Sequence, residues 1–150
     1  MAARIAFELV SPEKLLLSED VEMVVVPGGE GNFGVLPGHA LFISTVRPGV
    51  IDVYEGNRVS ERIFVSGGFA EVTPERCTVL ADEAMEPAAL DRAQLDAELQ
   101  TLDGNLPSLR EQAARAQGTE KERLLTELRR LERQQGVARA KLQALAEISR

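Results

Sequence analysis

The chain has little of the chemistry on which most enzymes depend. Its 150 residues include one cysteine, Cys77, and one histidine, His39. A single cysteine excludes an internal disulfide and a zinc site built on cysteines. Because a catalytic histidine or cysteine needs a positioned partner, this pair by itself supports neither a Cys-His catalytic site nor a metal centre. The sequence therefore favours binding or coupling over catalysis, and Cys77, which lies in a strand-like run, is expected to be a small buried residue.

Long apolar runs are also missing. No segment approaches the roughly 20 consecutive apolar residues that a membrane-spanning helix needs. The first residues lack the apolar region of a signal peptide and pass directly into a strand-like pattern. We therefore expect a mature protein that faces the cytoplasm and does not insert directly into a membrane.

Acidic residues outnumber basic ones, and the excess lies in the first part of the chain. Residues 1–86 hold 6 Lys/Arg and 14 Asp/Glu, net −8, whereas residues 87–150 hold 11 and 10, net +1. Nucleic acid is a poor partner for so acidic a domain. Residues 119–150 carry 8 basic and 5 acidic residues, which suits an acidic protein surface. A solvated helix face explains the same bias equally well.

Residues 1–86 have the pattern of short strands separated by turns. Apolar residues alternate with polar or small ones at Ile5, Phe7 and Leu9, the period of a half-buried strand. Gly or Pro interrupts the later runs, with no helical period between them, which predicts a β-sandwich or barrel. Gly56 and Asn57 form a two-residue hairpin connection. Further strands are expected at residues 21–26, 41–47, 50–54, 58–65, 69–73 and 76–81.

The most unusual stretch, residues 28–42, holds five glycines, Pro37 and the histidine. Residues 29–34 fit the G-x-G-x-x-G pattern of nucleotide-binding loops. That pattern binds phosphate only where it opens a helix, and Pro37 and Gly38 break any helix immediately afterwards. We therefore interpret the glycines as shaping a turn between strands, and we expect His39 to make a surface or structural polar contact.

From Pro87 onward the apolar period changes to that of packed helices. Two antiparallel helices are predicted, with Gly118 at their turn and Thr119 and Glu122 as a capping box. Gly104 and Pro107 predict a kink or short break in the first helix. The apolar stripes are thin, so the hairpin is expected to be marginally stable. The predicted core positions are Leu95, Leu99, Leu102, Leu106, Leu109, Ala113, Ala116, Leu124, Leu128, Leu131, Gln135, Ala138, Leu142 and Leu145.

Four motifs follow one another along the chain, at residues 34–40 (GVLPGHA), 47–50 (RPGV), 65–72 (VSGGFAEV) and 78–84 (TVLADEA). In this order they closely resemble the motifs of the epsilon subunit of bacterial F-type ATP synthases. The resemblance covers essentially the whole chain, although the hairpin matches only in kind and is longer than expected. It implies a β + α fold, in which an N-terminal β-sandwich of about ten strands precedes a C-terminal two-helix hairpin. Residues 1–86 would dock on the stalk and ring, and residues 87–150 would regulate.

The same resemblance implies a non-catalytic rotor subunit without a cofactor. Such a subunit binds the gamma subunit and the c-ring, and it couples proton-driven rotation to ATP synthesis. Its C-terminal helices restrain ATP hydrolysis by contacting the catalytic beta and alpha subunits. The implied location is peripheral, on the cytoplasmic side of the bacterial inner membrane.

Carried over residue by residue, the resemblance assigns c-ring contact to Glu30, Gly31, Asn32 and His39. An acidic residue is expected in relatives where Asn32 stands, so charge pairing is not expected at that point. Contact with the catalytic subunits is assigned to Arg123, Arg129, Arg130, Arg133 and Arg139.

Some relatives bind ATP at the start of the first helix through the pattern Ile/Leu-Asp-x-x-Arg-Ala. Here Asp91 is followed directly by Arg92, and glutamine stands at the expected arginine position, Gln94. Adjacent helical residues do not share a face. Asp91 and Arg92 therefore cannot present the usual pair to ATP, and ATP could bind to this degenerate site only in another arrangement. We expect Arg92 to be a solvated residue.

Two functions of other classes remain as alternatives. One is a free-standing interaction module, in which a coiled coil accompanies a β-domain that binds a peptide or a sugar. The other is an enzyme that uses the glycine-rich stretch on a nucleotide. Binding to a gamma subunit distinguishes the stalk subunit from the first, and tight nucleotide binding lost on Gly31→Val would support the second.

Overall fold

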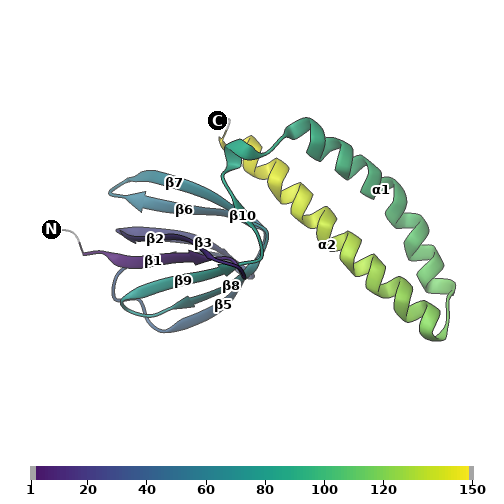
Figure 1. Ribbon diagram of the computed structural model, residues 1–150, viewed down its shortest axis with the longest axis horizontal. Coiled ribbons are helices and arrows are strands. Elements are labelled where there is room, and N and C mark those ends of the chain that lie inside the picture. The colour runs from purple at the N-terminus through teal and green to yellow at the C-terminus, as the bar shows by residue number, and fades with distance from the viewer. Residues whose placement is uncertain (1–2, 149–150) are drawn as a thin grey trace. The chain divides into compact units, whose positions relative to one another are not determined.

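The computed structural model describes residues 3–148 and is shown in Figure 1. The chain divides into two compact units between Ala89 and Leu90. The first contains the strands and the second contains two helices. Because each unit has its own packing, they are described separately.

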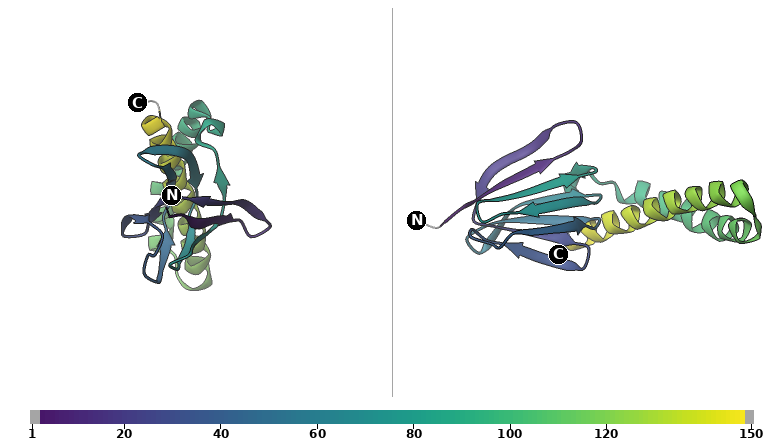
Figure 2. Two further views of the ribbon diagram at one scale, coloured as in Figure 1. Left: turned by 90° about the vertical axis from the view of Figure 1, so that its left-hand side faces the viewer. Right: turned by 90° about the horizontal axis from the view of Figure 1, so that it is seen from below.

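Ten strands lie within the described part of the first unit, which confirms the predicted β-sandwich. They follow the order β10-β7-β6-β3-β5-β8-β9-β1-β2, with β4 paired to β3. Figures 1 and 2 show them running alongside one another as a strongly curved sheet. The strands are β1 (Ile5–Val10), β2 (Leu15–Val21), β3 (Met23–Gly28), β4 (Gly31–Val35), β5 (Phe42–Val46), β6 (Gly49–Glu55), β7 (Arg58–Val65), β8 (Gly68–Val72), β9 (Arg76–Ala81) and β10 (Ala84–Met85), followed by the short 3₁₀ helix η1 (Pro87–Ala89).

The core of this unit follows directly from the period of two. Phe7 on β1 is fully buried, as are Cys77 and Val79 on the neighbouring β9, whereas the residues between them point outward. Cys77 is thus the small buried residue that the sequence predicted. Burial raises the pKa of its thiol to about 12, because the thiolate is poorly solvated there. A thiol in that state is unreactive near neutral pH.

Turn chemistry was predicted well in one place and badly in another. The β6–β7 hairpin is closed by Gly56 and Asn57, and Gly56 has φ +64°. The glycine-rich stretch, however, contains the strand β4 and not merely a turn, and β3 continues through Pro27 to Gly28 to pair with it. Pro27 has no N–H to donate, but its carbonyl oxygen still accepts a hydrogen bond from the Arg47 amide at 2.9 Å. The strand therefore tolerates the proline at this position.

The N-terminal strand boundaries also differ from the prediction. The predicted strand at residues 21–26 is in fact split, because β2 ends at Val21 and β3 begins at Met23. The sequence analysis did not predict β2 as a strand, because it contains polar residues such as Ser18 and Asp20. β2 lies at the end of the strand order, and one of its faces is exposed to solvent, where polar residues are expected. β10, which pairs with β7 at Val65, has only two residues and is too short to show an alternating apolar pattern in the sequence.

The second unit contains α1 (Arg92–Arg115) and α2 (Gly118–Ile148), which pack against each other. Of the kink or short break predicted in α1, the break is wrong, because the helix continues through Pro107, and the kink stays a prediction. A proline removes only one backbone hydrogen bond from the ladder. Leu106 before Pro107 and Ala113 after it are almost fully buried and keep the helix in place.

The turn between the helices lies at residues 116–117, and α2 begins at Gly118, which has φ +64°. Thr119 therefore lies inside α2, and the predicted capping box is wrong. Ala144 is buried although it was not among the predicted core positions. The buried residues of the hairpin are Leu95, Leu102, Leu106, Ala113, Leu124, Ala138 and Ala144, while the leucines at 99, 109, 128, 131, 142 and 145 are only half-buried.

Candidate functional site

The turn between β3 and β4 presents Glu30 and Gly31 to solvent. Glu30 is exposed in the turn, and Gly31 opens β4 with φ +142°, opposite Gly28. A side chain on Gly28 would collide with the Gly31 carbonyl oxygen, 2.6 Å from an added Cβ. The glycines thus let the two strands approach closely, and no helix follows them. This geometry gives no support to a nucleotide-binding loop of the G-x-G-x-x-G kind.

Asn32 is fixed by an arginine. Arg47, just after β5, donates from Nη2 to Asn32 Oδ1 at 2.6 Å and from Nη1 to the Gly28 carbonyl oxygen at 2.6 Å. The guanidinium therefore ties the β3–β4 hairpin to the end of β5. A carboxylate at position 32 would make this contact an ion pair, whereas the amide keeps the hydrogen bond without the charge.

His39 lies in the loop between β4 and β5. Its Nδ1 is 2.8 Å from the Ala40 carbonyl oxygen, so Nδ1 carries the hydrogen and donates it. The ring contacts Phe42 edge-on with centroids 6.3 Å apart, and Phe42 contacts Phe33 at 5.0 Å. The Gly38 amide donates to the Pro74 carbonyl oxygen at 2.8 Å. These contacts confirm the structural polar contact predicted for His39 and fix the position of the loop.

The outward face of β8, β9, β1 and β2 carries an apolar row that the sequence analysis missed. The register places Phe69 opposite Leu80, Leu80 opposite Val10, and Val10 opposite Leu15. Three of these side chains are strongly exposed, at 58% for Phe69, 45% for Leu80 and 56% for Leu15. Ile43 on β5 is 77% exposed but lies opposite Glu71, beside this row, whereas Thr45 lies opposite Phe69. Solvent-facing positions of a sheet usually hold polar residues, so this contiguous apolar surface indicates a binding face.

A polar row runs beside this apolar row. Glu71, Thr78 and Glu8 are paired across β8, β9 and β1, two residues along from the apolar row. Arg76 pairs with Glu8 at 3.5 Å. A shallow hollow of about 330 Å³ opens here, lined by Glu71, Thr73, Glu75, Arg76 and Thr78. The binding face thus combines an apolar strip with a polar margin.

The hairpin arginines divide into two groups. Arg123 pairs with Glu120 at 2.8 Å, Arg130 with Glu127 at 2.7 Å, and Arg139 with Asp103 across the hairpin at 3.3 Å. Arg129 and Arg133 are exposed and have no ion-pair partner among residues 3–148. Being four residues apart, these two share one helix face.

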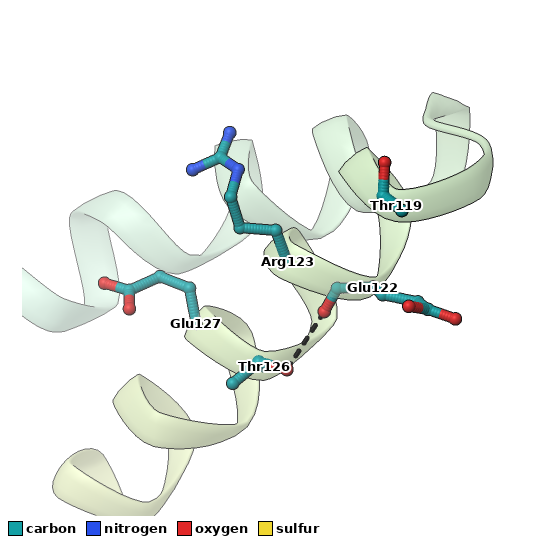
Figure 3. A pocket seen from close by; sticks show the side chains of 5 residues that line it. All are labelled: Thr119, Glu122, Arg123, Thr126 and Glu127. Atoms are coloured by element: carbon teal, nitrogen blue, oxygen red, sulfur yellow. Dashed lines mark hydrogen bonds between the residues drawn. The ribbon is translucent and has the colours of Figure 1, made fainter.

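Figure 3 shows the first turns of α2, where the side chains of Arg123 and Glu127 lie on a surface hollow of about 440 Å³. Thr126 donates to the Glu122 carbonyl oxygen at 3.0 Å, a bond within the helix. The hydrogen bond from Arg130 lowers the pKa of Glu127, and the bond to Glu120 raises the pKa of Arg123. The charges on this surface are therefore largely balanced within α2.

Asp91 caps the N-terminus of α1. Its Oδ1 accepts a hydrogen bond from the Gln94 amide at 3.2 Å, which makes it the N-cap of the helix. Arg92 is the exposed first residue of α1. The capping hydrogen bond explains why an aspartate stands at position 91 without a bound nucleotide. ATP binding at Asp91 and Arg92 stays a prediction.

Glu19 on β2 is hydrogen-bonded to Glu61 on β7. Their hydrogen bond is the largest cause that raises the pKa of Glu19 to about 7, followed by burial and by the charges of Glu61 and Glu55. The folded state thus binds the proton of Glu19 more tightly than the unfolded chain. Its contribution to the free energy of unfolding is complete below about pH 4.5 and is lost as the pH rises to about 7.

Replacing Glu19 by Gln should remove that pH dependence, because the amide keeps a donor toward Glu61 and carries no charge. We expect Glu19→Gln to raise the free energy of unfolding at pH 8 by about 1 kcal/mol and to change it little at pH 5. Urea denaturation at the two pH values measures this. Glu13→Gln, at an exposed position before β2, is the matched control. Equal destabilisation of the Glu19 variant at both pH values would contradict the raised pKa of Glu19.

Within residues 3–148, no group of three or more His, Cys, Asp and Glu side chains is arranged to hold a metal ion. No helix in the same range is long and apolar enough to cross a membrane. The fold defines a protein of two units, in which a β-sandwich with an exposed apolar row precedes a helical hairpin with exposed arginines.

Comparison with known proteins identifies the family. The β-sandwich domain of the "ATP synthase, Delta/Epsilon chain" family matches residues 4–87. The "ATP synthase epsilon chain" of Rhodospirillum rubrum is 56% identical over 120 residues, which cover 80% of this chain and 90% of the relative. That of Parvibaculum lavamentivorans is 46% identical over 129 residues, covering 86% and 98%. The chain therefore belongs to the ATP synthase epsilon chain family, as its motifs predicted.

Solved structures show the same fold at low sequence identity. A chain in the Euglena gracilis mitochondrial ATP synthase, solved with OSCP, F1 and the c-ring, matches with a TM-score of 0.65 and 22% identity, covering 99% of this chain and 82% of that chain. A chain in the central stalk and c-ring of the Tetrahymena thermophila enzyme matches with a TM-score of 0.52 and 16% identity, covering 61% and 73%.

Proposed function

We propose that the chain is a non-catalytic central-stalk subunit of a proton-translocating F-type ATP synthase, lying peripherally on the cytoplasmic side of a bacterial inner membrane. Its β-sandwich, residues 1–86, binds the gamma subunit and the c-ring and couples their rotation to ATP synthesis. Its hairpin, residues 87–150, restrains ATP hydrolysis through the catalytic beta and alpha subunits. The observation that carries the proposal is the match to epsilon chains over most of the length of both chains.

Two surfaces of the sandwich fit the two rotor partners. The apolar row of Phe69, Leu80 and Leu15 suits a gamma subunit, since a permanent partner covers apolar surface. The β3–β4 turn and the neighbouring loop, with Glu30, Gly31, Asn32 and His39, suit the polar loops of a c-ring. The Arg47 bonds and the aromatic contacts hold these two segments in fixed positions, as a docking surface requires.

Binding to the gamma subunit tests the proposal directly. The purified chain is mixed with the gamma subunit of the same synthase, and complex formation is followed by calorimetry and gel filtration. We expect a stoichiometric complex and no ATP turnover by the chain alone. Absence of binding, or turnover by the purified chain, would overturn the proposed function. Binding to an unrelated peptide or sugar instead would favour the interaction module.

The hairpin arginines should act collectively on hydrolysis. Arg129 and Arg133 are already free of ion pairs within the described chain, so reversing both to Glu removes cations that are available to a partner. We expect the double variant to raise the ATPase activity of the reconstituted enzyme about two- to fivefold, since exposed pairs are individually weak. Reversal of all five arginines, which adds Arg123, Arg130 and Arg139 to the pair, should raise the ATPase activity further.

The matched control is the double reversal of Arg123 and Arg130, whose charges are balanced by Glu120 and Glu127. It should raise ATPase activity less than the reversal of Arg129 and Arg133. If the two double variants have the same activity as the unmodified enzyme, contact through α2 arginines is wrong.

A further inference from the structure

Polar contacts join α1 to α2 in one short stretch of the hairpin. Gln134 Nε2 donates to Glu98 Oε1 at 2.9 Å. One turn further along α1, Asp103 Oδ1 accepts from Gln135 Nε2 at 2.5 Å and from Arg139 Nη2 at 3.3 Å. A single carboxylate oxygen on α1 therefore receives an amide and a guanidinium from α2.

The amide partner is the more informative one. Gln135 occupies a core position of the apolar pattern and is half-buried there, beside the fully buried Ala138. A polar group in an apolar seam is destabilising unless it is hydrogen-bonded. Asp103, whose side chain is more than half exposed, supplies that bond at the edge of the seam, and the polar pair favours the register in which the helices pack.

The cation partner links this contact to regulation. Arg139 is one of the arginines proposed to contact the catalytic subunits, and in the closed hairpin its guanidinium faces Asp103. Both side chains are more than half exposed, so solvent screens the ion pair and makes it easily exchanged. A contact of that kind can be replaced by carboxylates on another protein.

Both helices are intrinsically weak at this point. Gly104 and Pro107 follow Asp103 in α1, and Gly136 follows Gln135 in α2. Glycine lowers helix propensity, and Pro107 has no N–H to donate to the Asp103 carbonyl oxygen. An added Cβ at Gly104 or Gly136 would meet nothing within 4 Å, so packing does not require glycine at either position. The cross-helix contacts thus lie where the helices support themselves least.

We propose that Asp103, with Gln135 and Arg139, forms a latch that holds the hairpin closed and keeps Arg139 engaged. Release of the latch opens the middle of the hairpin and frees Arg139 for a carboxylate-bearing protein surface. The second part rests on the proposed function, because that surface is assigned to the catalytic subunits. The first part concerns this chain alone.

Amide hydrogen exchange of the full-length chain tests the latch without any partner. In Asp103→Ala we expect the backbone amides in the middle of both helices to exchange about three- to tenfold faster. Alanine is a better helix former than aspartate, so an effect of propensity alone would slow exchange. Asp96→Ala, at an exposed α1 position, is the matched control and should not speed it.

A charge swap separates the latch from a general effect of substitution. Asp103→Arg and Arg139→Asp should each speed exchange, and the double variant should return toward the unmodified rate. Gly136→Ala should slow exchange by strengthening α2 without touching the latch residues. Unchanged exchange in Asp103→Ala, or a double variant no slower than the single ones, would overturn the latch.

ATPase activity of the reconstituted synthase gives the second readout. If an open hairpin restrains hydrolysis, Asp103→Ala should lower ATPase activity about two- to fivefold. Faster exchange with unchanged ATPase activity supports the latch and overturns the inhibitory role of the hairpin. Unchanged exchange overturns the latch, whatever the ATPase activity.

Discussion

Removal of the hairpin is expected to raise the ATPase activity of the reconstituted enzyme about fivefold or more, within the usual range of coupling between sites. The shortened chain should still fold, because the core cluster of the sandwich is built entirely from residues 5–81. Two cuts are informative. One ends at residue 89 and keeps η1, whose Pro87 is buried, and the other ends at residue 86.

The control for this experiment is binding to the gamma subunit, which both shortened chains should retain at the affinity of the full chain. Under that condition a change in ATPase activity reports the loss of the hairpin and not the loss of the subunit. Equal ATPase activity with the full-length and shortened chains would show that the hairpin does not restrain hydrolysis in this synthase.

A charge in the apolar row should weaken assembly with the gamma subunit strongly. We expect Phe69→Glu to weaken binding to the gamma subunit about 30-fold or more, because a buried aromatic anchor commonly contributes that much and a buried unpaired carboxylate adds to the loss. The side chain is 58% exposed in the free chain, so the substitution should leave the fold intact. Calorimetric titration measures the affinity, and circular dichroism confirms the fold.

Ser60→Glu is the matched control, since Ser60 is exposed and lies on β7, a strand that does not pair with β8, β9, β1 or β2. It should bind the gamma subunit as the unmodified chain does. Undiminished binding by Phe69→Glu, or an equal loss in both variants, would remove the apolar row from the interface.

Local chemistry explains which elements the sequence predicted well. The strand at residues 58–65 and its Gly56-Asn57 turn were predicted to the residue, because a two-residue turn fixes the register of both strands. The heptad positions similarly identified most buried residues of the hairpin. The failures arose where tertiary contacts override local signals. Glycine-rich β4 is a strand because β3 pairs with it, and α1 passes Pro107 because buried Leu106 and Ala113 hold the helix before and after it.

The candidate sites show the same division. Composition and motifs led to Glu30, His39 and the arginines, but no pattern in the sequence distinguished Arg129 and Arg133 from the arginines that are already paired. The apolar row was hidden for another reason. Phe69, Leu80 and Leu15 are far apart in sequence, and only the strand register shows that they are neighbours on the outward face.

Parallel pairing of β1 with β9 ties the beginning of the sandwich to its end, since Ala6 lies opposite Arg76. During synthesis on the ribosome β1 must wait for β9 to emerge before this pair can form. Such nonlocal pairing slows folding and leaves strand edges open to other nascent chains in the meantime. The helices follow β9 in the sequence and pack through local contacts, so we expect closure of the β-domain to be the slow step in the maturation of this subunit.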